Sequence, residues 1–378
     1  MIKRLKVSHY RSLGQSIDLR LSPVSILVGP NGSGKSNLLD VLSFVRDAVS
    51  LGLPGAITHR GGIDNVRKHS TGRPFDVSIT MEIELKEGAA GYGFSITGDR
   101  LEEYRVKSEH AFVNNVSYDR HGADWKGPTE FAPRIDDQSL ALTALGGALQ
   151  FKPLSDFLSE MAVYTVFPDT LREPQKYDHA RPMKAHGQNW VSILRELLKS
   201  DETRTDLVRA LKRLSGDIED IRVKPAANHL ITEFKQTPPT QKSKTWFGAA
   251  QQSDGTLRVA GLITALLQKP PLPVIGIEEP ELTVHPGVLP MLMDYLKQAG
   301  TQSQILVSTH SPILLDEVNI ENDSIFVVNR RNGTTVIRRV RDKQLEPVKS
   351  RLMSLGDLFA SGDLQLSLDF DSQQENEE

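Results

Sequence analysis

The feature that most constrains this chain is a glycine-rich run between a strand-like segment and a helix-like segment. The run completes the pattern GxxxxGK followed by Ser or Thr, with Gly29, Pro30, Asn31, Gly32, Ser33, Gly34, Lys35 and Ser36. An apolar segment, 24–28, precedes it, and a helical pattern over 36–49 follows it. Strand, loop and helix in this order predict a phosphate-binding loop within an α/β fold.

The residue types of this run suit a nucleoside triphosphate. Glycines allow successive backbone N–H groups to turn toward phosphate oxygens, and Lys35 can reach the β- and γ-phosphates. The Ser36 hydroxyl is the expected Mg²⁺ ligand, and Asn37 opens the helix whose N-terminus would face the phosphates. A glycine-rich turn without a ligand is the alternative, and the flanking strand and helix disfavour it.

Composition bounds the class of protein. The 378 residues are 38% hydrophobic and 25% charged, which is ordinary for a globular protein of more than one domain. The chain has no Cys, which excludes disulfides, thiolate zinc sites and thiol catalysis. It has no apolar run long enough to span a membrane and begins without a secretory segment, so we expect a cytoplasmic protein without membrane contact.

The net charge of −3 argues against coating nucleic acid by global charge, but local basic patches remain. Each of two basic stretches is either solvated surface or a face that contacts phosphates. The second surrounds a hairpin predicted at Asn332-Gly333, since both residues tolerate positive φ. The first stretch contains His59, Arg60, Arg67, Lys68 and Arg73, and the second contains Arg330, Arg331, Arg338, Arg339, Arg341, Lys343, Lys349 and Arg351.

Hydrophobic patterning predicts four regions. We expect an N-terminal lobe over 1–135, a mainly helical insertion over 136–235, a C-terminal lobe over 236–365 and a disordered acidic tail over 366–378. The first lobe alternates apolar and polar residues in strand-like segments, which predicts an antiparallel sheet. These segments are 75–85, 92–96, 103–106 and 111–113, and the short strands expected before them at 2–7, 17–21 and 24–28 open an α/β nucleotide domain. In the C-terminal lobe, strands at 273–277 and 304–307 are each followed by a helix, which predicts a parallel-sheet core.

Two carboxylates follow the first of these C-terminal strands. Glu278 and Glu279 stand at the strand end where ligands bind in open α/β sheets. Successive side chains on a strand point in opposite directions, so we expect the two to have different tasks. We assign Glu278 to Mg²⁺, through its water shell, and Glu279 to the water that attacks a γ-phosphate. An acidic turn without function is the alternative.

Two further motifs flank the carboxylates in the sequence. His310 follows the strand at 304–307, where an imidazole could hydrogen-bond a γ-phosphate or the attacking water, or could be purely structural. Ser253, Asp254 and Gly255 precede a helix predicted over 256–267. Ser253 or Asp254 could cap that helix, or the helix N-terminus could bind an anion.

In this order, the phosphate loop, Ser-Asp-Gly-Thr-Leu-Arg at 253–258, Glu-Glu-Pro-Glu at 278–281 and Ser-Thr-His-Ser-Pro at 308–312 resemble the ABC-type AAA family ATPases of the RecF, SMC and OLD-like group. The resemblance covers essentially the whole chain and implies a P-loop ABC-type head fold that binds ATP and Mg²⁺. The resemblance implies that the loop is the Walker A motif. It also implies that Glu278 is the Walker B carboxylate, that Glu279 is the catalytic carboxylate and that His310 is the switch histidine. It makes 253–255 the signature motif, which in that family completes the site of a second protomer in a homodimer. Glu278 departs from the Asp that many ABC proteins carry.

The resemblance implies an ATPase that acts as a nucleotide-gated dimeric switch for a separate effector protein, in anti-phage defence or DNA maintenance. The segment 355–364 could dock such an effector or pack on its own domain. A RecF-like clamp that closes on DNA through Arg338, Arg339 and Arg341 is the alternative function. We expect a stand-alone ATPase, because the chain has no room for a long coiled-coil arm and no acidic cluster after Pro312 that would build a nuclease domain. The long insertion and the Ser-Asp-Gly signature disfavour a transporter ATPase.

Overall fold

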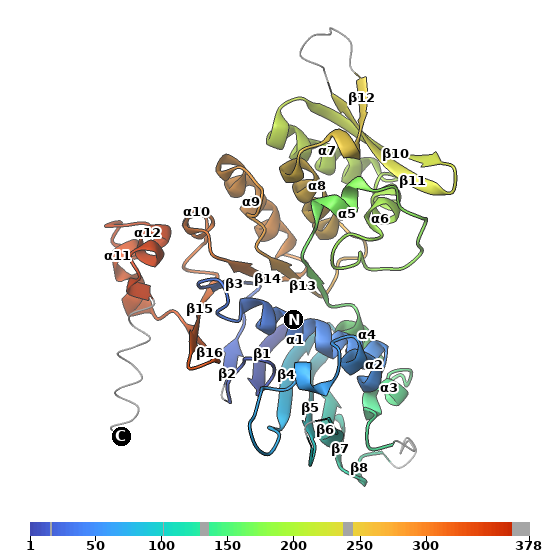
Figure 1. Ribbon diagram of the computed structural model, residues 1–378, viewed down its shortest axis with the longest axis vertical. Coiled ribbons are helices and arrows are strands. Elements are labelled where there is room, and N and C mark those ends of the chain that lie inside the picture. Colours follow the sequence, from blue (N-terminus) through green and yellow to red (C-terminus); the bar gives the residue numbers. More distant parts are fainter. Residues whose placement is uncertain (16, 101, 129–135, 237–244, 365–378) are drawn as a thin grey trace. The chain divides into compact units, whose positions relative to one another are not determined.

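The computed structural model describes residues 1–15, 17–100, 102–128, 136–236 and 245–364 (Figure 1). The chain forms two compact units. Unit 1 comprises residues 1–161, 320–352 and 361 onward, and unit 2 comprises 162–319 and 353–360. Each unit therefore combines segments that are distant in the sequence. The boundaries expected at 136 and 236 follow changes of sequence pattern and stay predictions.

Unit 1 contains a seven-stranded antiparallel sheet, which confirms the prediction for the first lobe. The strand order is β2-β1-β4-β5-β6-β7-β8. The strands are β1 Ile2–Ser8, β2 Ile17–Arg20, β4 Val77–Leu85, β5 Gly88–Thr97, β6 Arg105–Val113, β7 Val116–His121 and β8 Asp124–Lys126. The separate strands expected at 103–106 and 111–113 are one strand, β6, because its ladder to β5 continues through the polar residues between them. β7 and β8 were not predicted.

A second group of strands in unit 1 leads into the phosphate loop. β3 (Val24–Val28) is buried throughout and pairs in parallel with β15 (Ser324–Arg331), which forms a hairpin with β16 (Thr334–Arg339). Asn332 and Gly333 have φ values of 48° and 77°, which confirms the predicted turn. The helices of unit 1 are α1 Lys35–Ser50, α2 Leu53–Thr58, η1 Ile63–Asn65, α3 Ala141–Leu145, α4 Lys152–Ser159, η5 Asp342–Leu345 and α11 Glu346–Lys349.

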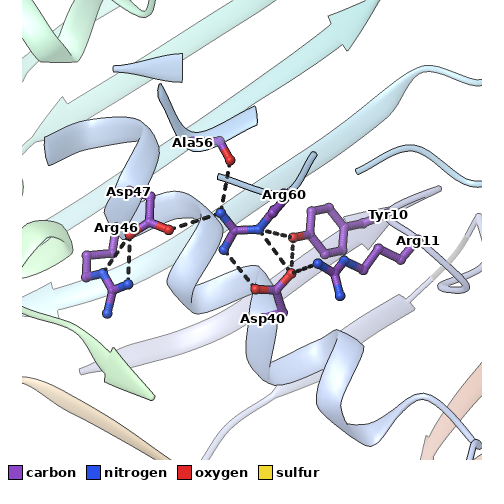
Figure 2. Close-up of polar contacts among 7 residues, drawn as sticks. All are labelled: Tyr10, Arg11, Asp40, Arg46, Asp47, Ala56 and Arg60. Atoms are coloured by element: carbon purple, nitrogen blue, oxygen red, sulfur yellow. Dashed lines mark hydrogen bonds and ion pairs between the residues drawn. The ribbon is translucent and has the colours of Figure 1, made fainter. Parts of the chain in front are cut away.

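A polar network ties α1 to the segments that follow β1 and α2 (Figure 2). Arg60, whose side chain is 7% exposed, donates to Asp40 and Asp47 at 2.8 and 3.0 Å. Tyr10 and Arg11 also contact Asp40. Burial by itself would raise the pKa of Asp40, but the bond and charge of Arg60, the charge of Arg11 and the Tyr10 hydroxyl hold that pKa below its usual value. Neither interpretation of the first basic stretch therefore holds at Arg60, because this guanidinium is buried in ion pairs.

Unit 2 is built around a short parallel sheet. β13 (Val274–Glu278) pairs in parallel with β9 (Ala162–Tyr164) and with β14 (Gln304–Thr309), which confirms the parallel strands predicted from two strand–helix units. α8 lies among four other helices of the unit, α5, α6, α7 and α9 (Figure 1). The helices are α5 Pro168–Arg172, α6 Trp190–Leu197, α7 Asp201–Ser215, η3 Ala249–Gln251, α8 Asp254–Leu266, η4 Pro286–Val288, α9 Leu289–Ala299, α10 Pro312–Asp316 and α12 Leu355–Ala360. An antiparallel sheet contains β10 Ile218–Ala226, β11 His229–Gln236 and β12 Thr245–Gly248.

The range 136–235, expected to be mainly helical, mixes helices α3 to α7 with strands β9, β10 and β11.

The segment 355–364 was expected either to dock an effector or to pack on its own domain. Within it, α12 packs against α10, and Gly356 N–H donates to Asp316 Oδ1 at 2.7 Å. The predicted acidic tail, 366–378, lies outside the described residues. Each helix that the structure describes is too short or too polar to cross a bilayer.

Candidate functional site

In the phosphate loop of unit 1, backbone geometry and close packing explain why several positions are glycine. Gly32 and Gly34 have φ values of 74° and 107°, a region that favours glycine. A Cβ atom at Gly34 would lie 2.1 Å from Thr335 Oγ1, and one at Gly29 would lie 2.1 Å from the Val328 carbonyl oxygen. The two hairpin strands β15 and β16 therefore press against the loop and leave no room for side chains at these positions.

Two side chains fix the inside of the loop. Lys35 Nζ donates to the carbonyl oxygens of Gly29 and Pro30, at 2.8 and 3.1 Å. Thr335 Oγ1 donates to the Ser33 carbonyl oxygen at 2.8 Å. These contacts hold the loop closed around the lysine, the side chain that the sequence assigns to phosphate binding.

The donor groups of the loop fit the phosphates of a nucleotide with bound Mg²⁺. The first N–H groups of α1 lack intrahelical acceptors, as in any α-helix, and no capping side chain accepts from them after Gly34. The N-terminus of a helix also carries a partial positive charge that attracts anions. Ser33 Oγ is buried without a hydrogen-bond partner. Ser36, the expected Mg²⁺ ligand, is exposed.

In unit 2, Glu278 and Glu279 lie at the end of β13 in different environments. Glu278 is the last residue of the strand, and its Oε2 accepts a hydrogen bond from Thr165 Oγ1 at 3.0 Å. Glu279 leaves the strand with a φ of 43°, an uncommon conformation for a side chain of this kind. Its N–H donates to the Ser308 carbonyl oxygen at 2.9 Å. The turn separates the two carboxylates, while their individual tasks stay predictions.

His310 lies beside Glu279, so the structure brings two predicted site residues together. His310 Nδ1 is 3.5 Å from Glu279 Oε1 and also 3.5 Å from Glu281 Oε1. The backbone N–H of His310 donates to Glu281 Oε1 at 3.0 Å. Because β13 and β14 are parallel neighbours, residues that follow each of them meet at one edge of the sheet.

Several polar side-chain atoms around this pair are buried and have no hydrogen-bond partner. Buried polar atoms are normally paired, so each exception calls for an explanation such as a catalytic role or a bound water or ion. Here they belong to Glu281, His310 and two residues that adjoin them in the structure, Ser308 and Arg258. The atoms are Ser308 Oγ, His310 Nδ1, Glu281 Oε2 and Arg258 Nε.

Arg258 joins helix α8 to the carboxylate turn. It is 4% exposed, and its guanidinium donates to the carbonyl oxygens of Val166 and Glu279 at 2.9 and 3.0 Å. Burial lowers the pKa of Arg258, while the charges of Glu281 and Glu279 act in the opposite sense. A change at the start of α8 can therefore reach the turn that carries Glu279.

The residues expected to form a signature motif begin α8. Ser253 Oγ accepts from the Thr256 N–H at 3.2 Å and caps the helix, which resolves the choice between Ser253 and Asp254 as the cap. The Asp254 carboxylate accepts a hydrogen bond from Arg172 of α5. A Cβ atom at Gly255 would lie 2.7 Å from the Thr283 carbonyl oxygen. Anion binding at 253–255 stays a prediction.

Five residues that shape the phosphate loop, the carboxylate turn or the start of α8 received no role from the sequence. Arg258 and Glu281 stand inside recognised motifs, so their positions gave a signal that was not used. The others act through strand pairing or helix packing with distant segments, and no local pattern marks them. The five are Thr165, Arg172, Arg258, Glu281 and Thr335.

Comparison with known proteins identifies relatives. Residues 24–139 and 194–316 match the family described as "AAA domain, putative AbiEii toxin, Type IV TA system". The OLD nuclease of Thermus scotoductus is 24% identical over 399 residues, which covers 96% of this chain and 68% of that protein. The chromosome partition protein Smc of Mycolicibacterium paratuberculosis is 23% identical over 257 residues, which covers 61% of this chain and 20% of that protein.

Solved structures show the same fold. The Smc head bound to the C-terminal winged-helix domain of ScpA superposes with a TM-score of 0.58 at 15% identity, over 92% of this chain and 99% of that chain. An Smc head with an extended coiled coil, bound to the C-terminal domain of ScpA from Pyrococcus furiosus, gives a TM-score of 0.53 at 13% identity, over 93% of this chain and 99% of that chain. These likenesses confirm the predicted P-loop head fold. Because the family match covers more than half of its length, the chain belongs to that AAA-domain family, among the ABC-type AAA ATPases of the SMC, OLD and RecF group.

Proposed function

We propose that this chain hydrolyses ATP and acts as a nucleotide-gated dimeric switch for a separate effector protein, in anti-phage defence or DNA maintenance. Membership in a family of ABC-type AAA ATPases supports the ATPase part. The observation that carries it is the contact between Glu279 and His310, 3.5 Å apart at the ends of two parallel strands. A carboxylate and an imidazole so placed can take a proton from water and hydrogen-bond a phosphate.

Each part of the site has a proposed task. The first N–H groups of α1 and Lys35 would bind the phosphates. Ser36, and Glu278 through the water shell of the ion, would hold Mg²⁺, whose charge would offset that of the phosphates. Glu279 accepts a proton from a water molecule whose oxygen attacks the γ-phosphorus. The bond from that phosphorus to the β,γ-bridging oxygen breaks, which gives ADP and phosphate. His310 donates a hydrogen bond to the γ-phosphate.

Dimerisation is proposed because 253–255 then completes the site of a second copy. Ser253 and Asp254 are exposed at the start of α8. Two apolar side chains next to site residues are also exposed, Leu282 by 38% and Ile313 by 44%.

Three variants test this function. Lys35→Ala should abolish ATP binding, and Glu279→Gln should keep binding, lose turnover and accumulate as an ATP-bound dimer. Glu346→Gln, at an exposed carboxylate of α11, is the matched control and should behave as wild type. ATP titration, phosphate release and light scattering measure these outcomes. A Glu279→Gln protein that stays monomeric with ATP contradicts the dimer, and a wild-type protein that releases no phosphate contradicts the ATPase.

Similar proteins support the proposal that the chain acts on a separate effector protein. An Smc head of the same fold binds a domain of ScpA, so this fold can dock another protein. The description of the matching family names an AbiEii toxin of a type IV TA system. Because α12 packs on α10 within unit 2, the effector surface should lie elsewhere than on α12. Mass spectrometry of proteins that co-purify with Glu279→Gln, and are absent with Lys35→Ala, tests this part.

A RecF-like clamp on DNA is the second candidate function. The second basic stretch supports it, because several of its cationic side chains are exposed around the β15–β16 hairpin. DNA affinity should then fall steeply with salt, and the slope should flatten when Arg338, Arg339 and Arg341 are changed to Ala. Affinity that is insensitive to salt removes this candidate. The exposed cationic residues of the whole stretch are Arg330, Arg339, Arg341, Lys343, Lys349 and Arg351.

A further inference from the structure

Glu281 is a carboxylate that the predicted chemistry does not use, yet it contacts the switch histidine more closely than Glu279 does. Its side chain is 7% exposed, against 26% for Glu279. Oε1 accepts from Thr309 Oγ1 at 2.6 Å and from the His310 N–H at 3.0 Å. One buried oxygen therefore holds both the residue before the histidine and the backbone of the histidine itself.

The same oxygen limits how the imidazole of His310 can act. Nδ1 is buried and lies 3.5 Å from carboxylate oxygens of both Glu279 and Glu281. Carboxylate oxygens accept hydrogen bonds, so the imidazole tautomer that suits this position carries its hydrogen on Nδ1. The side chain of His310 is 37% exposed. Because Nδ1 is buried, this nitrogen is not part of the exposed surface. Nε2 is then the one ring nitrogen through which His310 can reach a ligand.

Glu281 is itself fixed from two sides. Its backbone carbonyl accepts from the Val284 N–H at 3.1 Å. Arg258 supplies a buried positive charge that interacts with both Glu281 and Glu279. A carboxylate held in this way can transmit its position to the histidine, because its side chain is buried and its Oε1 accepts from two donors of the histidine segment.

We propose that Glu281 is a positioning residue for hydrolysis: it fixes the backbone of His310 and keeps Nδ1–H turned inward, so that Nε2 points to the substrate. This inference rests on the proposed ATPase function. It makes Glu281 act through His310, without contact of its own with the nucleotide. Loss of Glu281 should therefore slow turnover and leave ATP binding intact.

A double-mutant cycle tests the inference. Glu281→Ala in the full chain should lower kcat about 10- to 100-fold and change KM for ATP less than about twofold. His310→Ala should lower kcat at least as much, and the double variant should be no slower than His310→Ala alone, since residues that act as a unit are not additive. Glu281→Gln keeps an oxygen acceptor and should recover part of the rate.

The possible results distinguish a failure of the role proposed for Glu281 from a failure of the proposed ATPase function. A loss in the double variant equal to the product of the single losses, or a rise in KM with unchanged kcat, overturns the role of Glu281 while the ATPase function stands. Wild-type protein without phosphate release overturns both. If Glu281→Ala does not fold, as judged by thermal unfolding, the cycle is run with Glu281→Gln. Thr309→Val removes the hydroxyl that donates to Glu281, and it should lower turnover. If it does so while Glu281→Gln turns over like wild type, the effect is due to the acceptor oxygen of residue 281. If neither variant loses turnover, the inference is overturned.

Discussion

The hydroxyl of Thr335 donates a hydrogen bond to the carbonyl oxygen of Ser33 at 2.8 Å, across 302 positions of sequence. The same hydroxyl lies 2.7 Å from Ser12 Oγ. The bond joins the β15–β16 hairpin to the phosphate loop within unit 1. The hairpin is therefore part of what shapes the loop, although its sequence carries no nucleotide-binding motif.

Thr335→Val should weaken ATP binding because it removes this hydroxyl and leaves the side-chain shape. The loss of one or two hydrogen bonds corresponds to about 1–2 kcal/mol, or about 5- to 30-fold in Kd. Isothermal titration with ATP measures it. Thr334→Val is the matched control, since the Thr334 hydroxyl accepts from Lys68 Nζ instead. Equal Kd values for the two variants would show that the Thr335 hydroxyl does not shape the loop.

Gly255→Ala should destabilise the chain by about 1–3 kcal/mol, because the added methyl group meets the Thr283 carbonyl oxygen at 2.7 Å. Thr283 has a φ of 60°, so its backbone has little freedom to move away. Denaturant unfolding monitors the change. Gly147→Ala is the control, because its Cβ atom meets no other group within 4 Å. The contact is unimportant if both variants unfold at the same denaturant concentration.

Asp40→Asn should lower the free energy of unfolding by about 1–3 kcal/mol at pH 7, because Arg60 would lose a charged partner. The pKa of Asp40 is lower in the folded chain than in the unfolded chain. Its contribution is therefore present above its unfolded pKa of about 3.9 and is lost as the pH falls through the folded value. The difference between wild type and variant should shrink below about pH 4.

The control for this prediction is Asp18→Asn, which breaks a pair with Arg4 that is more exposed. Such surface pairs contribute less than about 1 kcal/mol. Urea unfolding at several pH values compares the two variants. A gap between wild type and Asp40→Asn that stays constant from pH 7 to acidic pH would contradict the assigned ion pair.

Arg258→Lys should slow ATP turnover, because an ammonium cannot reach the carbonyl oxygens of Val166 and Glu279 together as the planar guanidinium does. We expect a loss of about tenfold in kcat, which corresponds to about 1.4 kcal/mol. Arg209→Lys, on the exposed side of α7, is the matched control. Phosphate release measures both variants, and equal rates would show that Arg258 does not position the turn.

Local physics made much of the fold predictable. The alternation of apolar and polar residues in β4 identified a half-buried strand, and Asn332-Gly333 identified a hairpin, because both signals depend on neighbours in the chain. The prediction was wrong for 103–106 and 111–113, which are one strand. Polar residues inside β6 hid its continuity, since partner strands supply its hydrogen bonds. β7 and β8 were missed for the same reason.

The sequence by itself determined the phosphate loop, the carboxylates after β13 and the position of His310 after β14. These signals are local, because a loop, a strand end or a helix start is specified by a few adjacent residues. Only the tertiary structure decided that Arg60 is buried between carboxylates, that Thr335 holds the loop and that Glu281 holds His310. Such contacts depend on the pairing and packing of distant segments, and the residues that make them carry no mark in the local pattern.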